Sequence, residues 1–459
     1  MYKDPENILP RLDGLYEGLE YGSSMEVENI RKDRSLIEES IKKRKLDLSV
    51  LDRFYDKDKE WRSLVKDLDA LRAEKNRISE QINKNRDKRD ELIKKASELD
   101  SRVRELEEKE RRVSEEREKA LFSLPNLVHP KWPLDKEEEV FVYGKPKVLK
   151  ANEEDFIKQF GSRDHIIANN VMSQYDIIRE YDLADEERGS ELAGPRFYYM
   201  KNDLVLLDNA LALYALKMLR EQGFKMVIPP YLVKRYVEER ATSFDAFEET
   251  LYKIEGEDLY LIPTAEHPIA AYNADRLLDE DELPLRYGGF SASFRKEAGA
   301  HGKDTKGIFR NHHFNKVEQY IVCKKDQVEA ELNRVMNNQA RLIRDLNIPF
   351  RVIKVPAFDM DKKALFQFDI EGWFPAQNRY RELGSHASVG TWQAVRFNIK
   401  YYDKNEKEKR YVHTIYSTLV PIERMLSALL ENNLQEDGRI VVPKVLADLV
   451  GFDEIKPVR

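Results

Sequence analysis

Residues 294–320 combine arginines, a glutamate and an aromatic side chain in a spacing that suits a nucleoside triphosphate. The stretch reads FRKEAGAHGKDTKGIFRNHHFNKVEQY, with Arg295 and Glu297 near its start and Arg310 and Phe314 on its return. Guanidinium groups bind phosphate oxygens through paired hydrogen bonds, and an aromatic face stacks on a purine ring. A basic surface hairpin without a ligand is the alternative. We interpret the stretch as two strands joined by a long polar loop that hold a nucleotide.

Thr264 and Glu266 follow an apolar, strand-like run that ends at Pro263. A hydroxyl beside a carboxylate at the end of a strand suits the ammonium group of a small polar ligand. Considered alone, Thr264 is better explained as a turn residue or a helix cap.

Glu382 and Ser385 lie close together in the run QNRYRELGS. Carboxylate and hydroxyl oxygens are suitable ligands for Mg²⁺ that is also bound by phosphates. The alternative is a cross-strand salt bridge between Glu382 and a neighbouring arginine.

Arg424 follows Pro421 at the predicted start of a helix. A cation in the first turn opposes the helix dipole, so a purely structural role explains Arg424 poorly. A phosphate explains it better, because the guanidinium and the backbone N–H groups then share one anion.

These residues must be positioned by a mixed fold in the C-terminal two thirds of the chain. Strand-like and helical segments alternate there without a Walker A motif or a strand–GxGxxG–helix unit, so we expect neither a P-loop nor a Rossmann site. The pattern favours an α+β fold with a mainly antiparallel sheet. The expected strands are 259–263, 287–294, 317–323, 350–355, 368–374, 394–402 and 413–418, and the expected helices are 204–222, 325–346 and 422–433.

Residues 23–124 contain neither Gly nor Pro, which favours helix throughout. Apolar residues recur there at spacings of three and four, and the segment 83–91 between the two series is polar. We therefore expect an antiparallel helical hairpin, a coiled coil with charged outer faces that projects into solvent. The seam would be formed by Trp61, Leu64, Leu68, Leu71, Ile78 and Ile82 with the polar Lys75, facing Leu92, Ala96, Leu99, Val103, Leu106, Val113 and Ala120.

The predicted tip of the hairpin is locally basic. Residues 84–95 contain six lysines and arginines and three acidic residues, a net charge of +3. A solvated helix end is the simpler explanation of such a run. Contact with the phosphates of a nucleic acid is the functional one.

The composition excludes several classes of protein. No apolar run approaches the ~20 residues of a membrane span, and no secretory signal is visible, so we expect no membrane association. Cys323 is the only cysteine, which excludes an internal disulfide and a zinc site made of several thiolates. We expect a cytoplasmic protein. The net charge of −7 argues against indiscriminate coating of nucleic acid but allows a local basic patch.

The motifs together resemble those of class II aminoacyl-tRNA synthetases, and particularly the seryl-tRNA synthetases. REQGFKMVIPPYL resembles motif 1, a helix and strand at the dimer interface of that class. FRKE with the returning Arg310-x-x-x-Phe314 resembles motif 2, and Pro421 to Arg424 with the following helix resembles motif 3. Thr264-Ala265-Glu266, AGAHGKDTKG, FNKVEQ, QNRYRE, LLENN and DGRIVVPKVL are similar to the seryl enzymes of archaeal, non-zinc type.

The resemblance implies ATP and Mg²⁺ as cofactors. Arg295 would hold the α-phosphate, Arg424 the γ-phosphate, and Phe314 would stack on the adenine. Catalysis would rest on Arg295, Glu382 and Arg424. The implied ATP site comprises Arg295, Glu297, Asn311 (through its backbone), Phe314, Glu382, Ser385 and Arg424, with Mg²⁺ on Glu382 and Ser385.

The same resemblance implies serine and tRNA(Ser) as the other substrates, and tRNA(Sec) where that tRNA is present. The serine site would comprise Thr264, Glu266, Arg295, Glu318 and Thr418. The hairpin would bind the tRNA, with Lys84, Arg86, Lys88 and Arg89 as candidate contacts. The implied assembly is a homodimer.

The chain departs from the family pattern at two places. Residues 386–392 read HASVGTW where family members have a run containing Cys and Asn, and Tyr416-Ser417-Thr418 replaces Asn-Gly-Ser or a similar small run. Leu419 stands where motif 3 usually has a Gly. Tyr416 and Leu419 would either crowd the serine pocket or belong to a repacked one.

We therefore expect a class II synthetase sheet flanked by helices and preceded by the hairpin. The expected divisions are an N-terminal extension (1–24), the tRNA-binding hairpin (25–124), a linker (125–140) and the catalytic domain (141–459). A ligase that loads an amino acid onto a carrier protein is disfavoured, because such relatives lack the hairpin. The alternative from another class is a catalytically altered paralogue that acts as an RNA-binding or interaction protein.

Overall fold

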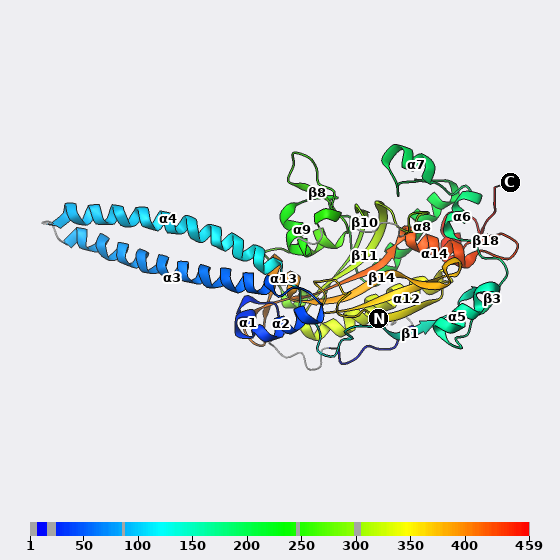
Figure 1. The fold of residues 1–459 in the computed structure, drawn as a ribbon, viewed down its shortest axis with the longest axis horizontal. Coiled ribbons are helices and arrows are strands. Elements are labelled where there is room, and N and C mark those ends of the chain that lie inside the picture. Colours follow the sequence, from blue (N-terminus) through cyan, green and yellow to red (C-terminus); the bar gives the residue numbers. More distant parts are fainter. Residues whose placement is uncertain (1–6, 16–23, 85–87, 245–247, 298–303, 459) are drawn as a thin grey trace. The chain divides into compact units, whose positions relative to one another are not determined.

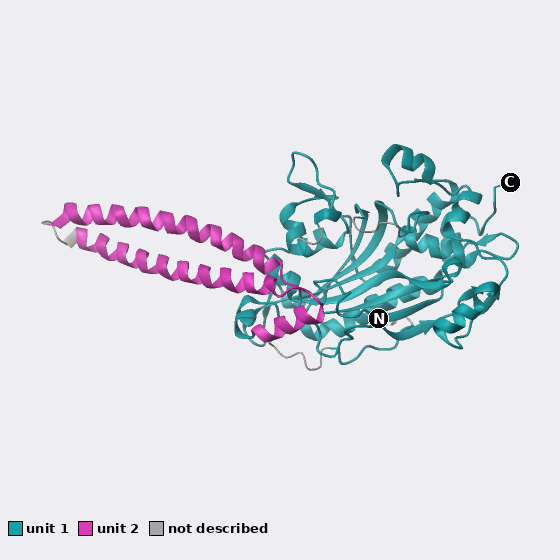
Figure 2. Ribbon diagram, in the orientation of Figure 1, with its two compact units in different colours: residues 1–33, 126–459 teal, residues 34–125 magenta. Residues whose placement is uncertain are grey.

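The computed structural model describes residues 7–15, 24–84, 88–244, 248–297 and 304–458. The chain divides into two compact units, residues 34–125 and residues 1–33 with 126–459 (Figure 2). Within the described ranges, no helix combines the length and the apolar character needed to cross a membrane.

The smaller unit is the helical hairpin expected from the sequence. α3 (Ser49–Lys84) and α4 (Arg89–Phe122) run antiparallel beside each other (Figure 1). At 1.5 Å per residue, the 36 residues of α3 extend over about 54 Å. The predicted seam is confirmed, because Leu64, Leu68, Ile78, Leu99, Val103 and Val113 are all buried.

Ion pairs between the two helices fix the register of the hairpin. Asp58 is buried and accepts hydrogen bonds from Arg62 Nε (3.0 Å) and Arg117 Nε (2.7 Å). The guanidinium of Arg117 also lies over the ring of Trp61. Farther along, Lys75 pairs with Asp100, which explains a polar residue in the seam.

The segment 23–48 is not one continuous helix, since α1 (Val27–Lys32) ends at Asp33 and α2 (Arg34–Lys43) is followed by turns.

The larger unit is built on an eight-stranded sheet in the order β1-β12-β13-β14-β17-β11-β10-β6 (Figure 1). Every neighbouring pair is antiparallel except β10 and β6, which confirms the predicted α+β class. The strands are β1 (Glu138–Tyr143), β12 (Phe350–Lys354), β13 (Phe366–Phe374), β14 (Arg379–Gly390), β17 (His413–Pro421), β11 (His313–Cys323), β10 (Leu285–Phe294) and β6 (Lys225–Val227).

The three predicted helices of this unit are confirmed as α8 (Asn202–Glu221), α12 (Val328–Asp345) and α14 (Ile422–Asn433). α12 packs against one face of the sheet: Gln319 on β11 donates to the carbonyl of Val335, and Gln339 donates to the carbonyls of Leu383 and Leu419. Because side chains alternate along a strand, Glu318 points to the opposite face.

Two β-bulges adjust which side chains reach that opposite face. Opposite β13, Glu382 pairs with Glu371 and Gly384 with Ile370, so Leu383 is an extra residue in β14. Opposite β11, Val420 pairs with Val317 and Thr418 with Glu318, so Leu419 is an extra residue in β17. A bulge reverses the alternation beyond it, which brings Glu382 and Ser385 to the same face although they are three residues apart.

One predicted strand is wrong. The run 394–402 begins in a helix, α13 (Trp392–Phe397), and only its end forms a strand, β15 (Lys400–Asp403). Asn398 ends α13 in the left-handed conformation (φ 50°), and Arg396 packs over the ring of Trp392. Local helix capping and packing therefore override the β-branched and aromatic residues that favour a strand.

Shorter elements cover the edges of the large unit. The N-terminal segment contributes to it, since the backbone N–H groups of Ile8 and Leu12 donate to Asn337 and Asn333 of α12. β1 begins at Glu138, within the range expected as a linker. The remaining elements are β2 (Lys147–Leu149), α5 (Glu153–Phe160), β3 (Ile166–Ala168), α6 (Gln174–Glu180), β4 (Ala184–Asp185), α7 (Glu186–Ala193), β5 (Tyr199–Met200), β7 (Leu232–Lys234), α9 (Arg235–Ala241), β8 (Leu259–Leu261), α11 (Glu266–Ala271), β9 (Leu277–Leu278), β16 (Glu408–Tyr411), β18 (Ile440–Val441), α15 (Lys444–Val450) and β19 (Glu454–Ile455).

Candidate active site

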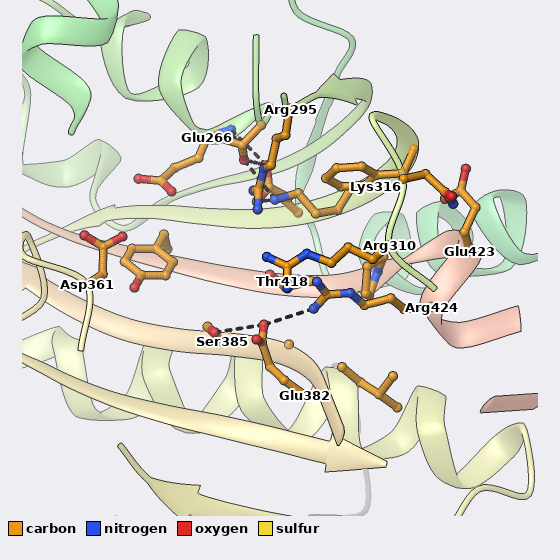
Figure 3. A pocket seen from close by; sticks show the side chains of 18 of the residues that line it. Glu266, Arg295, Arg310, Lys316, Asp361, Glu382, Ser385, Thr418, Glu423 and Arg424 are labelled. Atoms are coloured by element: carbon orange, nitrogen blue, oxygen red, sulfur yellow. Dashed lines mark hydrogen bonds and ion pairs between the residues drawn. The ribbon is translucent and has the colours of Figure 1, made fainter. Parts of the chain in front are cut away.

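A cavity of about 230 Å³ lies on the face of the sheet opposite α12. Its walls come from β11, β14 and β17, the start of α14, the start of α11 with the segment before it, and the segment that follows β10 (Figure 3). Every residue assigned above to ATP, serine or Mg²⁺ lines this one cavity. They are Thr264, Glu266, Arg295, Glu297, Asn311, Phe314, Glu318, Glu382, Ser385, Thr418 and Arg424.

One end of the cavity carries arginines and aromatic rings. The Arg295 guanidinium lies 5.3 Å from the ring centre of Phe314, and Arg310 Nε donates to Glu297 (2.5 Å). The Arg424 guanidinium lies 4.9 Å from the ring centre of Phe309. Burial lowers the pKa of the Arg295 guanidinium, and Glu297 offsets part of this effect. Cations beside flat apolar faces are the groups that bind a purine nucleotide.

Glu382 and Ser385 face the cavity together because of the bulge at Leu383. Ser385 Oγ donates to Glu382 Oε1 (3.4 Å), and Arg424 Nη1 lies 3.5 Å from the same oxygen. The Glu382 side chain is 47% exposed, so its carboxylate is accessible to a ligand. No cluster of three or more Asp, Glu, His or Cys side chains that could hold a metal alone occurs among the described residues. A divalent cation would therefore also need oxygens from a phosphate ligand, which agrees with the chemistry of this donor pair.

The other end of the cavity is a network of buried charges around Glu318. Lys316 Nζ lies 2.7 Å from Glu318 Oε1 and donates to Thr264 Oγ1 (3.0 Å). The Thr264 hydroxyl and the backbone N–H of Glu266 donate to the other oxygen of Glu318. Burial alone would raise the pKa of Glu318, but Lys316 and these donors hold it below its ordinary value. Glu318 is therefore a buried carboxylate anion.

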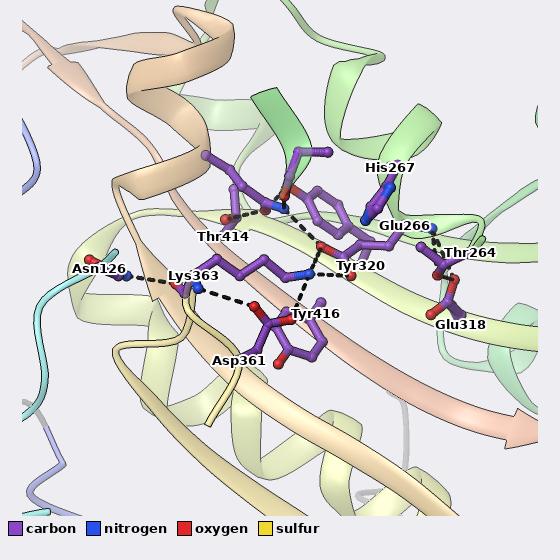
Figure 4. Close-up of polar contacts among 12 residues, drawn as sticks. Asn126, Thr264, Glu266, His267, Glu318, Tyr320, Asp361, Lys363, Thr414 and Tyr416 are labelled. Carbon is purple, nitrogen blue, oxygen red and sulfur yellow. Dashed lines mark hydrogen bonds and ion pairs between the residues drawn. The ribbon is translucent and has the colours of Figure 1, made fainter. Parts of the chain in front are cut away.

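Glu266 is paired with a lysine that the sequence interpretation did not include. Lys363 Nζ lies 3.1 Å from both carboxylate oxygens of Glu266, and Gln393 Nε2 donates to Oε1 (2.8 Å). Figure 4 shows the Lys363 chain extending toward Glu266, with Asp361 and Tyr416 beside it. Glu266 begins α11, so Thr264 does mark the start of a helix as well as a wall of the cavity.

The departures from the family pattern differ in their consequences. His386 is buried between Ser417 Oγ and Gln339 Oε1 (both 2.7 Å) on the α12 side of the sheet, and Leu419 is the buried bulge residue. Neither lines the cavity. Tyr416 does line it, and its hydroxyl donates to Gln367 Oε1 (3.4 Å). Of these departures, Tyr416 and Thr418 line the cavity, and Tyr416 is the one that places a bulky side chain in its wall.

Arg310, which the sequence placed in the nucleotide-binding stretch without a specific contact, lines the cavity, and so do four residues that the sequence interpretation did not include: Lys316, Asp361, Lys363 and Gln367. Lys316 has a signal, because it precedes Glu318 by two residues on the same strand and must share its face. Lys363 and Asp361 lie in the connection before β13 and have no such signal.

The predicted tRNA contacts lie in the sequence where α3 ends and α4 begins. Lys88 and Arg89 are exposed. Lys84 is the last residue of α3, and Arg86 lies outside the described residues.

The sheet and its arginine-lined cavity define a class II aminoacyl-tRNA synthetase, and the profile of the "tRNA synthetase class II core domain (G, H, P, S and T)" matches residues 249–433. The "Seryl-tRNA synthetase N-terminal domain" matches residues 25–128. The chain is 42% identical over 445 residues to the serine–tRNA ligase of Pyrococcus furiosus, covering 95% of this chain and 98% of the relative. It belongs to the seryl-tRNA synthetase family, which are serine–tRNA ligases.

Other relatives and solved structures support the same family assignment. The serine–tRNA ligase of Thermoplasma volcanium is 40% identical and covers 94% of this chain and 99% of the relative. The crystal structure of seryl-tRNA synthetase from Pyrococcus horikoshii complexed with ATP superposes with a TM-score of 0.87 at 40% identity, covering 95% of this chain and 100% of that one. The cytoplasmic serine–tRNA ligase of Naegleria fowleri in complex with AMP gives a TM-score of 0.76 at 30% identity, with 93% and 96% coverage.

Proposed function

We propose that the cavity binds ATP at its arginine-rich end and serine at its Glu318 end, and that Arg295 lies between the two substrates. The observation that carries this proposal is the convergence of all the residues assigned to ATP, serine and Mg²⁺ on one cavity, with cations at one end and buried carboxylates at the other (Figure 3). The relative from P. horikoshii, which is complexed with ATP, supports the assignment of the nucleotide.

In the proposed ATP site, Arg295 binds the α-phosphate and Arg424 the γ-phosphate. Phe314 stacks on the adenine, while Glu297 and the backbone of Asn311 contact its polar edge. Glu382 and Ser385 would hold Mg²⁺ together with the phosphates, and the ion would supply positive charge against the phosphate oxygens. The exposed carboxylate of Glu382 and its hydrogen-bonded neighbour Ser385 support this role.

In the proposed serine site, Glu318, Thr264, Glu266 and Thr418 surround the ammonium and hydroxyl groups, and Arg295 orients the carboxylate. The pairing of Thr418 directly opposite Glu318 across β17 and β11 supports their joint role. A carboxylate oxygen of serine attacks the α-phosphorus, the bond to the bridging oxygen breaks, and pyrophosphate leaves. A terminal hydroxyl of the tRNA then attacks the carbonyl carbon of the adenylate, releasing AMP and leaving an ester. Positioning and charge neutralisation by arginines supply most of the acceleration.

The hairpin would bind tRNA(Ser), and tRNA(Sec) where present, through basic side chains near its tip. The exposure of Lys88 and Arg89 supports this proposal, with Lys84 and Arg86 as further candidates from the sequence. The proposed division is an extension (1–24), the hairpin (25–124), a linker (125–140) and the catalytic domain (141–459).

A homodimer in the cytoplasm is the proposed form of the enzyme. Exposed apolar side chains on α8 and on the motif 1 segment support an interface there: Val205, Leu206, Leu213, Met226 and Ile228. Each is at least 38% exposed in the single chain, as expected of residues that a second copy covers.

A catalytically altered, RNA-binding paralogue is the second candidate, because Tyr416 alters the cavity wall. The two are separated by a charging assay with purified protein, radiolabelled serine, ATP, Mg²⁺ and a tRNA(Ser) transcript. The proposed function requires acid-precipitable seryl-tRNA that depends on ATP. Binding of the transcript without any ATP-dependent charging would support the paralogue instead.

A further inference from the structure

Lys363 is the most completely enclosed cation of the cavity's amino-acid end. Its side chain is 4% exposed and its ammonium group lies 3.1 Å from Glu266 and 3.1 Å from Asp361. Burial alone would lower the pKa of Lys363, but these two carboxylates raise it above its ordinary value. The ammonium is therefore a fixed positive charge that two carboxylates of the chain itself hold in place.

Lys363 and Tyr416 form one packed unit. The ammonium lies 4.5 Å from the centre of the Tyr416 ring, close enough for a cation–π contact. The Tyr416 hydroxyl in turn donates to Gln367 (3.4 Å), and Tyr416 is 8% exposed. Each side chain restricts the other, so neither can swing aside without losing its partner.

This unit stands at the end of the cavity remote from the nucleotide groups. Figure 3 shows Glu266 and Asp361 on one side, Arg310 and Arg424 on the other, with Arg295 and Thr418 between them. A substrate whose carboxylate reaches Arg295 must direct its ammonium and side chain toward the Lys363 end. The length available to that side chain therefore ends at Lys363 and Tyr416.

We propose that Lys363 and Tyr416 are specificity-determining residues that close the amino-acid end of the pocket and exclude substrates larger than serine. The inference rests on the proposed function. The ammonium pairs with Glu266 and Asp361 and lies against the ring, so the closing wall is filled by side chains that hold one another in place. An additional methyl group, as in threonine, meets this wall.

The test compares serine and threonine in amino-acid-dependent ATP–pyrophosphate exchange. Lys363→Ala and Tyr416→Ala should each lower the serine-to-threonine ratio of kcat/KM at least about tenfold, the discrimination that one methyl group commonly provides. Tyr416→Phe, which keeps the ring, should leave the ratio within about threefold of wild type. Lys362→Ala is the matched control, since this neighbouring lysine does not line the cavity.

Charge and volume are separated by a second pair of variants. Lys363→Met keeps the length of the side chain but leaves Glu266 without its cation, so KM for serine should rise. The double variant with Glu266→Gln restores the net charge of the wild-type wall, and its serine-to-threonine ratio of kcat/KM should stay within about threefold of wild type.

If an alanine variant no longer catalyses exchange, its specificity is measured instead by direct binding of adenylate analogues. Calorimetric affinities for the sulfamoyl analogues of seryl- and threonyl-adenylate should show the same loss of preference. If both alanine variants keep the wild-type preference for serine over threonine, by exchange or by binding, the inference is overturned. In that case serine exchange by the wild type still leaves the proposed function intact. Absence of serine exchange in the wild type would instead contradict the proposed function.

Discussion

Arg424 Nη1 lies 3.5 Å from Glu382 Oε1, an ion pair that joins the first turn of α14 to β14 across the mouth of the cavity (Figure 3). The Arg424 side chain is 25% exposed and that of Glu382 47%, so the pair contributes little to stability. Its two members are the groups that we assign to the γ-phosphate and to Mg²⁺. The residues that we propose for the γ-phosphate and for Mg²⁺ are therefore direct neighbours.

Replacing Glu382 by Gln should lower serine-dependent exchange about 100-fold, because Mg²⁺ loses a charged ligand that stabilises the phosphates in the transition state. The Mg²⁺ concentration for half-maximal exchange should also rise. Exchange rates measured over a Mg²⁺ titration check both effects. The exposed Glu408→Gln is the control, and a Glu382→Gln variant with an unchanged Mg²⁺ optimum would refute the assigned metal contact.

Reversing the charges of Lys88 and Arg89 should weaken the binding of tRNA(Ser) and leave tRNA-independent exchange unchanged. Each lost phosphate contact lowers the magnitude of the slope of log affinity against log salt concentration by about one. The slope for the double variant should therefore be smaller in magnitude by about two. Filter binding over a range of salt concentrations measures this slope. Lys407→Glu with Lys409→Glu makes the same change of net charge at another exposed site. Equal effects of the two double variants would contradict a contact at the tip.

Asp58→Ala should loosen the hairpin, because two arginines lose a buried acceptor that joins α3 to α4. A loss of about 1–3 kcal/mol is expected for such hydrogen bonds. Hydrogen exchange of the backbone amides of α3 and α4 should accelerate, whereas exposed Asp67→Ala should not change it. Unaltered protection in Asp58→Ala would mean that the apolar seam alone holds the register.

Glu423 should make the stability of the fold depend on pH. Burial, and then the neighbouring Asp208, raise the pKa of Glu423 from 4.5 to about 8. Because the pKa of Glu423 is higher in the folded than in the unfolded protein, the protonated carboxyl group contributes to the stability of the fold. This contribution is complete at pH below 4.5 and is lost as the pH rises through 8. Glu423→Gln does not titrate, so its melting temperature relative to wild type should rise by at least about 2 °C between pH 5 and pH 8.5. A difference that does not change with pH would show that Glu423 is ionised in the folded protein.

The sequence predicted the elements that carry the site better than the contacts within it. Strand ends, glycine-free helices and the arginine spacing are local features, and they located β10, β11, α14 and the hairpin. The bulges at Leu383 and Leu419 were not predictable, although they decide that Glu382 and Ser385 share a face. The partnership of Lys363 with Glu266 joins segments 97 residues apart, and no local pattern encodes it.

The wrong prediction of a strand at 394–402 also arises because packing contacts, which no local pattern encodes, decide the structure there. β-branched and aromatic residues favour a strand there by propensity, but Trp392 and Arg396 pack on one turn of helix that Asn398 ends. Asn398 is the one local signal that pointed to a helix end.

The most direct measurement is ATP–pyrophosphate exchange by the purified protein with serine, threonine, alanine or glycine supplied one at a time. We predict exchange with serine at a kcat/KM at least 100-fold above that with each of the others, and a decrease of serine exchange by a factor of about 1000 or more in Arg295→Ala. Exchange with another amino acid in preference to serine, or near-normal serine exchange by Arg295→Ala, would contradict the central claim.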